Sequence, residues 1–158
     1  MGGTAGTSDT NEDVVERARY YSPANIFNVE RPAIPQMAFT AERDQAMAPD
    51  APTGWIPMDI GQQIGLDEPA TTPLMLARYA RIASGETLAA SFRASGEFYY
   101  VISGDGRATK ADENFRWEAG DVFSLPGGGK TWLDGGAGGA VLLQVTNEPE
   151  LAFHGLAA

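Results

Sequence analysis

The segment from Gly85 to Gly104, GETLAASFRASGEFYYVISG, constrains the fold of this chain more than any other. Two strand-like halves, 86–93 and 97–103, flank a break at 94–96, and a Gly-Asp-Gly turn follows at 104–106. The second half is rich in aromatic and β-branched residues, which favour a pleated, half-buried surface over a helix. We therefore expect a β-hairpin that leads directly into another strand.

Short strand-like segments, separated by glycine-rich or acidic turns, fill the rest of the second half of the chain. Short strands at this spacing are typical of an all-β sandwich or barrel, and no internal repeat divides them. The second half therefore predicts one all-β domain over residues 73–158. Besides the hairpin, its expected strands are 74–82, 106–111, 115–117, 121–125, 130–134 and 140–146.

The first seventy residues predict a different organisation. Residues 1–9 are rich in Gly, Thr and Ser, which predicts a disordered leader. Residues 10–72 predict an arm that packs on the barrel or on a partner subunit. Its expected parts are an amphipathic helix at 10–21, an extended stretch at 25–38 that contains two prolines, and a brief helix at 40–47 capped by Thr40.

The composition excludes several classes of function. The chain of 158 residues contains no cysteine, which removes thiol catalysis and disulfides. Its 21 acidic and 11 basic residues give a net charge of −10, which repels nucleic acids and anionic membranes. No apolar run reaches the roughly 18 to 20 residues that cross a bilayer. We therefore expect a cytoplasmic protein whose partners are neither nucleic acids nor membranes.

Two stretches resemble the two motifs of the cupin superfamily. The first motif places a Gly, a His-x-His pair, a Glu and a second Gly at fixed spacing, and the matching positions here are Gly85, Ser91, Arg93, Glu97 and Gly104. The second motif resembles residues 120–128, GDVFSLPGG, and its histidine position holds Thr131. The resemblance implies a double-stranded β-helix, the jelly-roll barrel of single-domain, RmlC-like cupins. Within the superfamily, residues 70–86 and 147–156 look most like the gentisate dioxygenase group.

The resemblance also implies a metal site, which this sequence does not reproduce. In metal-binding cupins the three histidines and the Glu hold iron, manganese, nickel or zinc. An arginine stays protonated, has no lone pair to donate and repels a cation. The sole histidine, His154, lies outside both motifs. We therefore expect no metal and no cofactor at the usual cupin site.

Strand alternation places Ser91 and Arg93 on one face, and Glu97 and Tyr99 on one face of the next strand. Two interpretations of this inward face remain open. In the first, Arg93 and Glu97 form an ion pair that fills the barrel. In the second, Arg93 receives the carboxylate of a small ligand while Glu97 or Tyr99 moves a proton. Arg78 is a second internal cation if its strand turns that face inward, and the sequence leaves its direction open.

The leading function is therefore a metal-independent protein that binds a small organic acid or aromatic ligand inside the barrel. Three alternatives remain: a metal-free isomerase, lyase or hydrolase, a degenerate barrel that serves as a structural or regulatory subunit, and a dioxygenase with an unusual metal site. An apolar stripe of Phe98, Tyr100 and Ile102 predicts a homodimer interface. The expected ligand-binding residues are Ser91, Arg93, Glu97, Thr131 and Arg78, and the expected catalytic residues are Glu97 and Tyr99.

Overall fold

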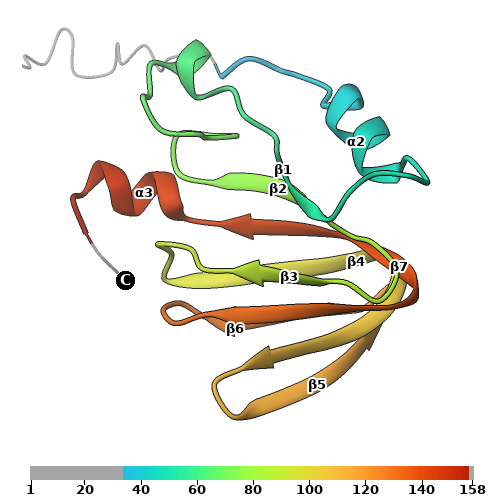
Figure 1. The fold of residues 1–158 in the computed structure, drawn as a ribbon. Helices are drawn as coiled ribbons and strands as arrows, with labels where there is room; N and C mark the ends of the chain where they lie inside the picture. Colours follow the sequence, from blue (N-terminus) through green and yellow to red (C-terminus); the bar gives the residue numbers. More distant parts are fainter. Residues whose placement is uncertain (1–33, 157–158) are drawn as a thin grey trace, which may run out of the picture. The chain divides into compact units, whose positions relative to one another are not determined.

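The computed structural model describes residues 34–156, and Figure 1 shows its elements. The expected leader and the helix expected at 10–21 lie outside these residues. No helix within the described range is long and apolar enough to cross a membrane. In chain order the elements are α2 (Thr40–Met47), β1 (Gly54–Pro57), the 3₁₀ helix η1 (Gly61–Ile64), β2 (Leu76–Ile82), β3 (Thr87–Ala90), β4 (Gly96–Lys110), β5 (Glu113–Glu118), β6 (Val122–Pro126), β7 (Thr131–Thr146) and α3 (Glu148–Phe153).

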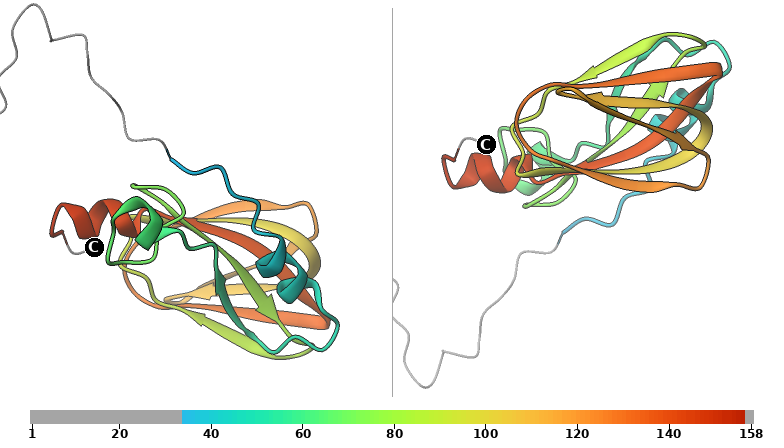
Figure 2. Two further views of the ribbon diagram at one scale, coloured as in Figure 1. Left: turned by 90° about the horizontal axis from the view of Figure 1, so that it is seen from above. Right: turned by 90° about the horizontal axis from the view of Figure 1, so that it is seen from below.

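All strand pairs are antiparallel, and two long strands hold the fold together. β4 and β7 pair with each other along their length. The first half of β7 pairs with β3 and its second half with β2, while the first half of β4 pairs with β6 and its second half with β5. Because both strands bend, two sheets face each other, as Figures 1 and 2 show. The all-β prediction is confirmed.

At two places where the sequence predicted a break between strands, the structure has a bend within one continuous strand. The turn expected at 104–106 is wrong, because β4 continues through it with register shifts at 101/103 and 104/106. Gly104 has a φ of +84°, and a Cβ there would lie 2.1 Å from the carbonyl oxygen of Gly139. The glycine therefore permits a bulge and a close strand approach rather than a chain reversal. Similarly, the strands expected at 130–134 and 140–146 are one strand, β7.

The predicted hairpin between 86–93 and 97–103 is also wrong. β3 ends at Ala90 and pairs with β7, whereas β4 pairs with β5, β6 and β7. Residues 91–95 form a loop between the two strands. The predicted helix at 40–47 is confirmed as α2, although Thr40 is its first residue and does not cap it.

The space between the sheets is filled by side chains. Ten buried residues form the main core, which includes Tyr99, Trp117, Leu133 and Leu142. On the outside, Ala46 of α2 packs with Ile56 and Val141, and the partly buried Ile102 joins this cluster. β1, inside the segment expected to be an arm, pairs with β2.

Candidate functional site

A row of polar side chains crosses three neighbouring strands inside the barrel. β2 alternates strictly between buried and half-buried residues, which turns Arg78 inward at 5% exposure. Arg78 pairs with Gln144 of β7, and Gln144 pairs with Tyr99 of β4. The direction of Arg78, which the sequence left open, is therefore inward.

The Arg78 guanidinium binds the carboxylate of Glu148, which belongs to the C-terminal helix α3. One of its terminal nitrogens donates to Oε1 of Gln144 at 3.1 Å, and the other donates to Oε2 of Glu148 at 2.5 Å. Thr146 donates to the same carboxylate oxygen at 2.6 Å. The guanidinium carbon lies 4.1 Å from the centre of the Phe92 ring, which stacks a cation on an aromatic face.

A second polar cluster surrounds Glu97, which is only 2% exposed. The phenol of Tyr99 donates to Oε2 of Glu97 at 2.5 Å, and Nζ of Lys110 donates to Oε1 at 3.2 Å. Lys110 also donates to Oγ1 of Thr131 at 3.2 Å. Lys110 is the last residue of β4 and Glu97 is close to its start, so the ammonium joins the two ends of the bent strand.

The surroundings of Tyr99 keep its phenol protonated. Burial raises the pKa of Tyr99 well above its usual range, and the neighbouring Glu97 raises it further. Gln144 and Arg78 oppose this shift without reversing it. Tyr99 therefore acts as a hydrogen-bond donor to Glu97.

The structure corrects the predicted positions of Ser91 and Arg93, while their predicted part in ligand binding stays a prediction. β3 ends before both residues, and both side chains are exposed in the loop at 91–95 instead of facing inward from a strand. Glu97 pairs with Lys110, so the expected ion pair between Arg93 and Glu97 is wrong. Of the four positions that match the cupin ligand set, only Glu97 and Thr131 are buried.

The sequence analysis did not identify Lys110 as an interior residue, because it precedes a turn, where a lysine side chain usually points to solvent. Its side chain is 16% exposed, and its ammonium bridges Glu97 and Thr131, the two motif positions that remain inside. An ammonium and a divalent metal ion compete for the same oxygens. Within residues 34–156 no three His, Cys, Asp or Glu side chains are grouped to hold a metal ion. The residues present therefore do not fit the metal of the cupin site.

Two adjoining pockets are lined in part by residues of α3. Figure 1 shows α3 directly after the end of β7. The pockets have volumes of about 190 and about 360 Å³, and both are lined by Glu68, Arg93 and Pro149. The smaller pocket reaches Arg78 and Glu148. Although Arg93 does not enter the barrel, it therefore lies in the wall of the pocket that leads to Arg78.

Comparisons with known proteins support the fold. No protein-family model matches the sequence, and no curated protein matches it. Salicylate 1,2-dioxygenase from Pseudaminobacter salicylatoxidans is 17% identical, with a TM-score of 0.58 over 75% of this chain and 35% of that chain. A protein of unknown function from Rhizobium leguminosarum is 16% identical, with a TM-score of 0.52 over 73% of this chain and 97% of that chain.

A cupin superfamily protein from Desulfitobacterium hafniense is 16% identical, with a TM-score of 0.49 over 65% of this chain and 85% of that chain. The strand order and the two structures with TM-scores of 0.58 and 0.52 show the fold: this chain has the cupin fold, an antiparallel double-stranded β-helix. The fold has a distant structural similarity to that of salicylate 1,2-dioxygenase.

Proposed function

We propose that this chain is a metal-independent cupin that binds a small organic acid at the α3 end of its barrel, with Arg78 as the residue that receives the acid. The observation that carries the proposal is a buried guanidinium that already holds a carboxylate and lines a pocket. Arginine is the side chain best suited to bind carboxylates away from water, because its planar fork matches their two oxygens.

Glu148 occupies the position of the ligand's carboxylate. Its side chain is 24% exposed and belongs to α3, a helix of six residues. Helices this short have little stability of their own, so Glu148 is free to exchange with an incoming acid at modest cost. The ring of Phe92, stacked on Arg78, then offers an apolar surface to the organic part of the ligand.

The charges that line the smaller pocket balance, because Arg78 and Arg93 stand against Glu68 and Glu148, and an acid that displaces Glu148 would meet two cations and one carboxylate. A net charge of −10 repels small acids at long range, so local cations decide whether an acid enters. Arg93 is an exposed cation in the pocket wall, and Arg78 is the buried cation behind it. The volume of about 190 Å³ limits the ligand to a small acid.

Isothermal titration calorimetry with acetate, succinate, benzoate and salicylate tests the proposal; the aromatic acids are included because salicylate names the enzyme with a similar fold. Arg78→Gln should weaken binding about 10- to 100-fold, because hydrogen bonds to charged groups contribute about 1.5–3 kcal/mol. Glu148→Gln should strengthen it, because the competing carboxylate is gone.

The matched control is Arg43→Gln on α2, which removes an exposed arginine outside these pockets and should leave acid binding unchanged. Equal affinity of the wild type and Arg78→Gln for every acid that binds would contradict the proposal. So would the absence of binding to all four acids by both the wild type and Glu148→Gln.

A degenerate barrel that serves as a structural or regulatory subunit is the second candidate, and the closed interior favours it. Glu97, Tyr99 and Lys110 fill the space of the cupin metal site with a satisfied hydrogen-bond cluster. The same closure weighs against an isomerase, lyase or hydrolase that uses Glu97 and Tyr99, because a ligand would have to open the barrel to reach them. A subunit role predicts no acid binding together with a stoichiometric complex with a different chain in native mass spectrometry.

A further inference from the structure

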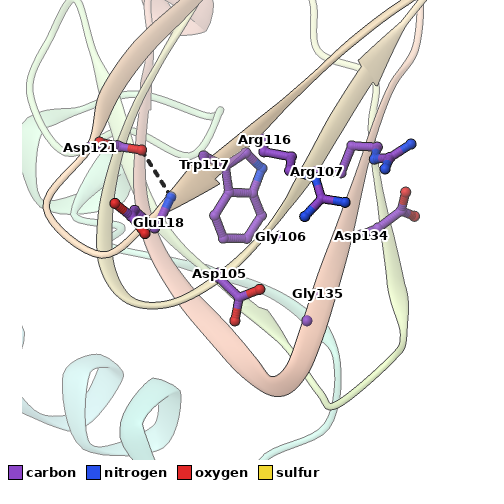
Figure 3. A pocket seen from close by; sticks show the side chains of 10 residues that line it. Asp105, Gly106, Arg107, Arg116, Trp117, Glu118, Asp121, Asp134 and Gly135 are labelled. Atoms are coloured by element: carbon purple, nitrogen blue, oxygen red, sulfur yellow. Dashed lines mark hydrogen bonds between the residues drawn. The ribbon is translucent and has the colours of Figure 1, made fainter.

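A separate cavity of about 510 Å³ lies among the bent parts of β4, β5 and β7, and it includes none of the residues around Arg78. Figure 3 shows its side chains, with the ring of Trp117 between Glu118 and Asp121 on one side and Arg107, Arg116 and Asp134 on the other. We propose that this cavity binds a small amphoteric molecule, one that carries an ammonium group and a carboxylate a few carbons apart.

Strand register sorts the charges of the cavity into two rows. Asp105 of β4 pairs with Glu118 of β5, which makes an acidic row. Two residues further along β4, Arg107 lies opposite Arg116 of β5, which makes a basic row. Residues two apart on a strand share a face, and their Cα atoms are about 6.5 to 7 Å apart, which sets the spacing of the two rows along the backbone.

The basic row has no ion-pair partner among the residues that the structure describes. Like charges directly opposite each other on neighbouring strands destabilise a sheet. Within residues 34–156 neither Arg107 nor Arg116 makes an ion pair or a side-chain hydrogen bond. Asp134 faces Arg107 from β7 in register, and its carboxylate accepts a hydrogen bond from Thr87. An added carboxylate between the two guanidinium groups would relieve their repulsion.

The wall of the cavity also contains a polar group without a partner. Trp117 is 3% exposed, and its indole N–H has no hydrogen-bond partner among the described residues. Figure 3 shows this nitrogen on the edge of the ring nearest Arg116. An unpaired buried donor costs free energy, which makes its retention beside a cavity an indication of a binding site.

Two glycines of the cavity wall allow a close approach of the backbone to the side chains of Trp117 and Asp105. Gly106 pairs with Trp117, and a Cβ at Gly106 would lie 2.4 Å from the indole ring. A Cβ at Gly136 would lie 2.4 Å from the carboxylate of Asp105. Side chains at these positions would displace the ring and the acidic row, so the two glycines define the shape of the cavity.

The spacing of the rows selects the ligand. A carboxylate at the arginines and an ammonium at the acidic row are joined by roughly four or five methylene groups at ordinary bond lengths. 6-Aminohexanoate is therefore a suitable probe. Hexanoate and hexylamine each carry one of its two charges and serve as matched control ligands.

The test follows the indole N–H resonances of the full chain by NMR while each probe is added. The chain has three tryptophans, so the resonance of Trp117 is assigned by its loss in Trp117→Phe. We expect 6-aminohexanoate to shift this resonance, with an affinity at least tenfold higher than that of hexanoate or hexylamine. Arg107→Gln and Arg116→Gln should each weaken binding about tenfold, and Asp105→Asn should reduce the preference over hexanoate.

Arg43→Gln, which removes an exposed arginine outside this cavity, is the control and should leave the affinity for 6-aminohexanoate unchanged. Equal affinity for 6-aminohexanoate and hexanoate would mean a simple anion site and would overturn the proposal. Equal affinity for 6-aminohexanoate and hexylamine would overturn it in the same way, as would the absence of any shift. Because Arg107 and Arg116 are exposed, loss of folding does not confuse the result.

Discussion

Glu97 shows how neighbouring side chains balance a buried carboxylate. Its two carboxylate oxygens have different partners, a neutral phenol from Tyr99 and a cation from Lys110. The carboxylate is almost fully buried, so these two donors must together offset the loss of its hydration. Thr131 is the second acceptor of the Lys110 ammonium. The ammonium thus balances the charge of the buried carboxylate.

Removal of Lys110 should destabilise the chain strongly. Lys110→Met leaves the Glu97 charge buried without its cation, which typically costs about 3–5 kcal/mol when one partner of a buried ion pair is deleted. We place the loss at the lower end, about 3 kcal/mol, because 16% of the lysine side chain is exposed. Urea denaturation of the wild type and of Lys110→Met measures the difference in unfolding free energy.

A second substitution separates the charge from the packing. Glu97→Gln in the Lys110→Met background removes the unbalanced carboxylate, so the double variant should be more stable than Lys110→Met alone. Lys130→Met is the control, because Lys130 is exposed and lies over the ring of Trp132 rather than in the interior. Exposed ion pairs contribute up to about 1 kcal/mol. If Lys110→Met lowers the unfolding free energy by less than this, the ion pair between Lys110 and Glu97 does not stabilise the fold.

At the scale of single residues, the sequence predicted the interior position of some site residues and not of others. The motif spacing placed Glu97 and Thr131 at matching positions, and both are buried. It failed for Arg93, because strand alternation was extended past Ala90, where β3 ends. Lys110 has no sequence signal, since its role depends on the bend that brings the two ends of β4 together.

At the scale of elements, the bent strands β4 and β7 decide where functional side chains gather. Each strand belongs to both sheets, so its two ends place residues on opposite walls of the barrel. Glycines at the bends allow close approach, and they leave space for the cavity beside Trp117. The same glycines misled the sequence analysis, because a Gly-rich stretch inside a strand and a turn have the same composition.

The basic row on β4 and β5 should cost stability when no ligand is present. Arg116→Gln removes the charge opposite Arg107, and directly opposed like charges cost about 0.2–1 kcal/mol. We expect the variant to unfold at a higher urea concentration than the wild type, although it binds 6-aminohexanoate more weakly. Arg43→Gln, an exposed arginine paired with the adjacent Asp44, is the control and should not stabilise the chain. A loss of stability in Arg116→Gln would show that its charge is already balanced.

At the scale of the whole molecule, the outer face of one sheet carries the apolar stripe expected from the sequence. Phe98, Tyr100 and Val122 are 43%, 40% and 59% exposed on the neighbouring strands β4 and β6. Ile102, which the sequence placed in the same stripe, packs instead with the cluster beneath α2. The exposed part is therefore shorter than expected, and it remains an apolar surface suited to contact with another chain.

We expect this surface to form the interface of a homodimer. Phe98→Asp should convert the dimer to a monomer, because it would bury a charge without a partner in the interface. Sedimentation velocity measures the two species directly. Phe153→Asp is the matched control, since Phe153 is 75% exposed on α3, away from β4 and β6, and its replacement should leave the dimer intact. A monomeric wild type, or a dimer that survives Phe98→Asp, would contradict this interface.

The salt dependence of dimerisation is a second test of the same interface. Each chain carries a net charge of −10, so two copies repel each other while their apolar faces attract. Added salt screens the repulsion over about 8–10 Å at 0.10–0.15 M and leaves apolar contact largely unaffected. The dissociation constant of the dimer should therefore fall as salt rises from low ionic strength to 0.15 M. A dimer held by ion pairs would instead weaken over the same range, so the direction of the change identifies which force joins the two chains.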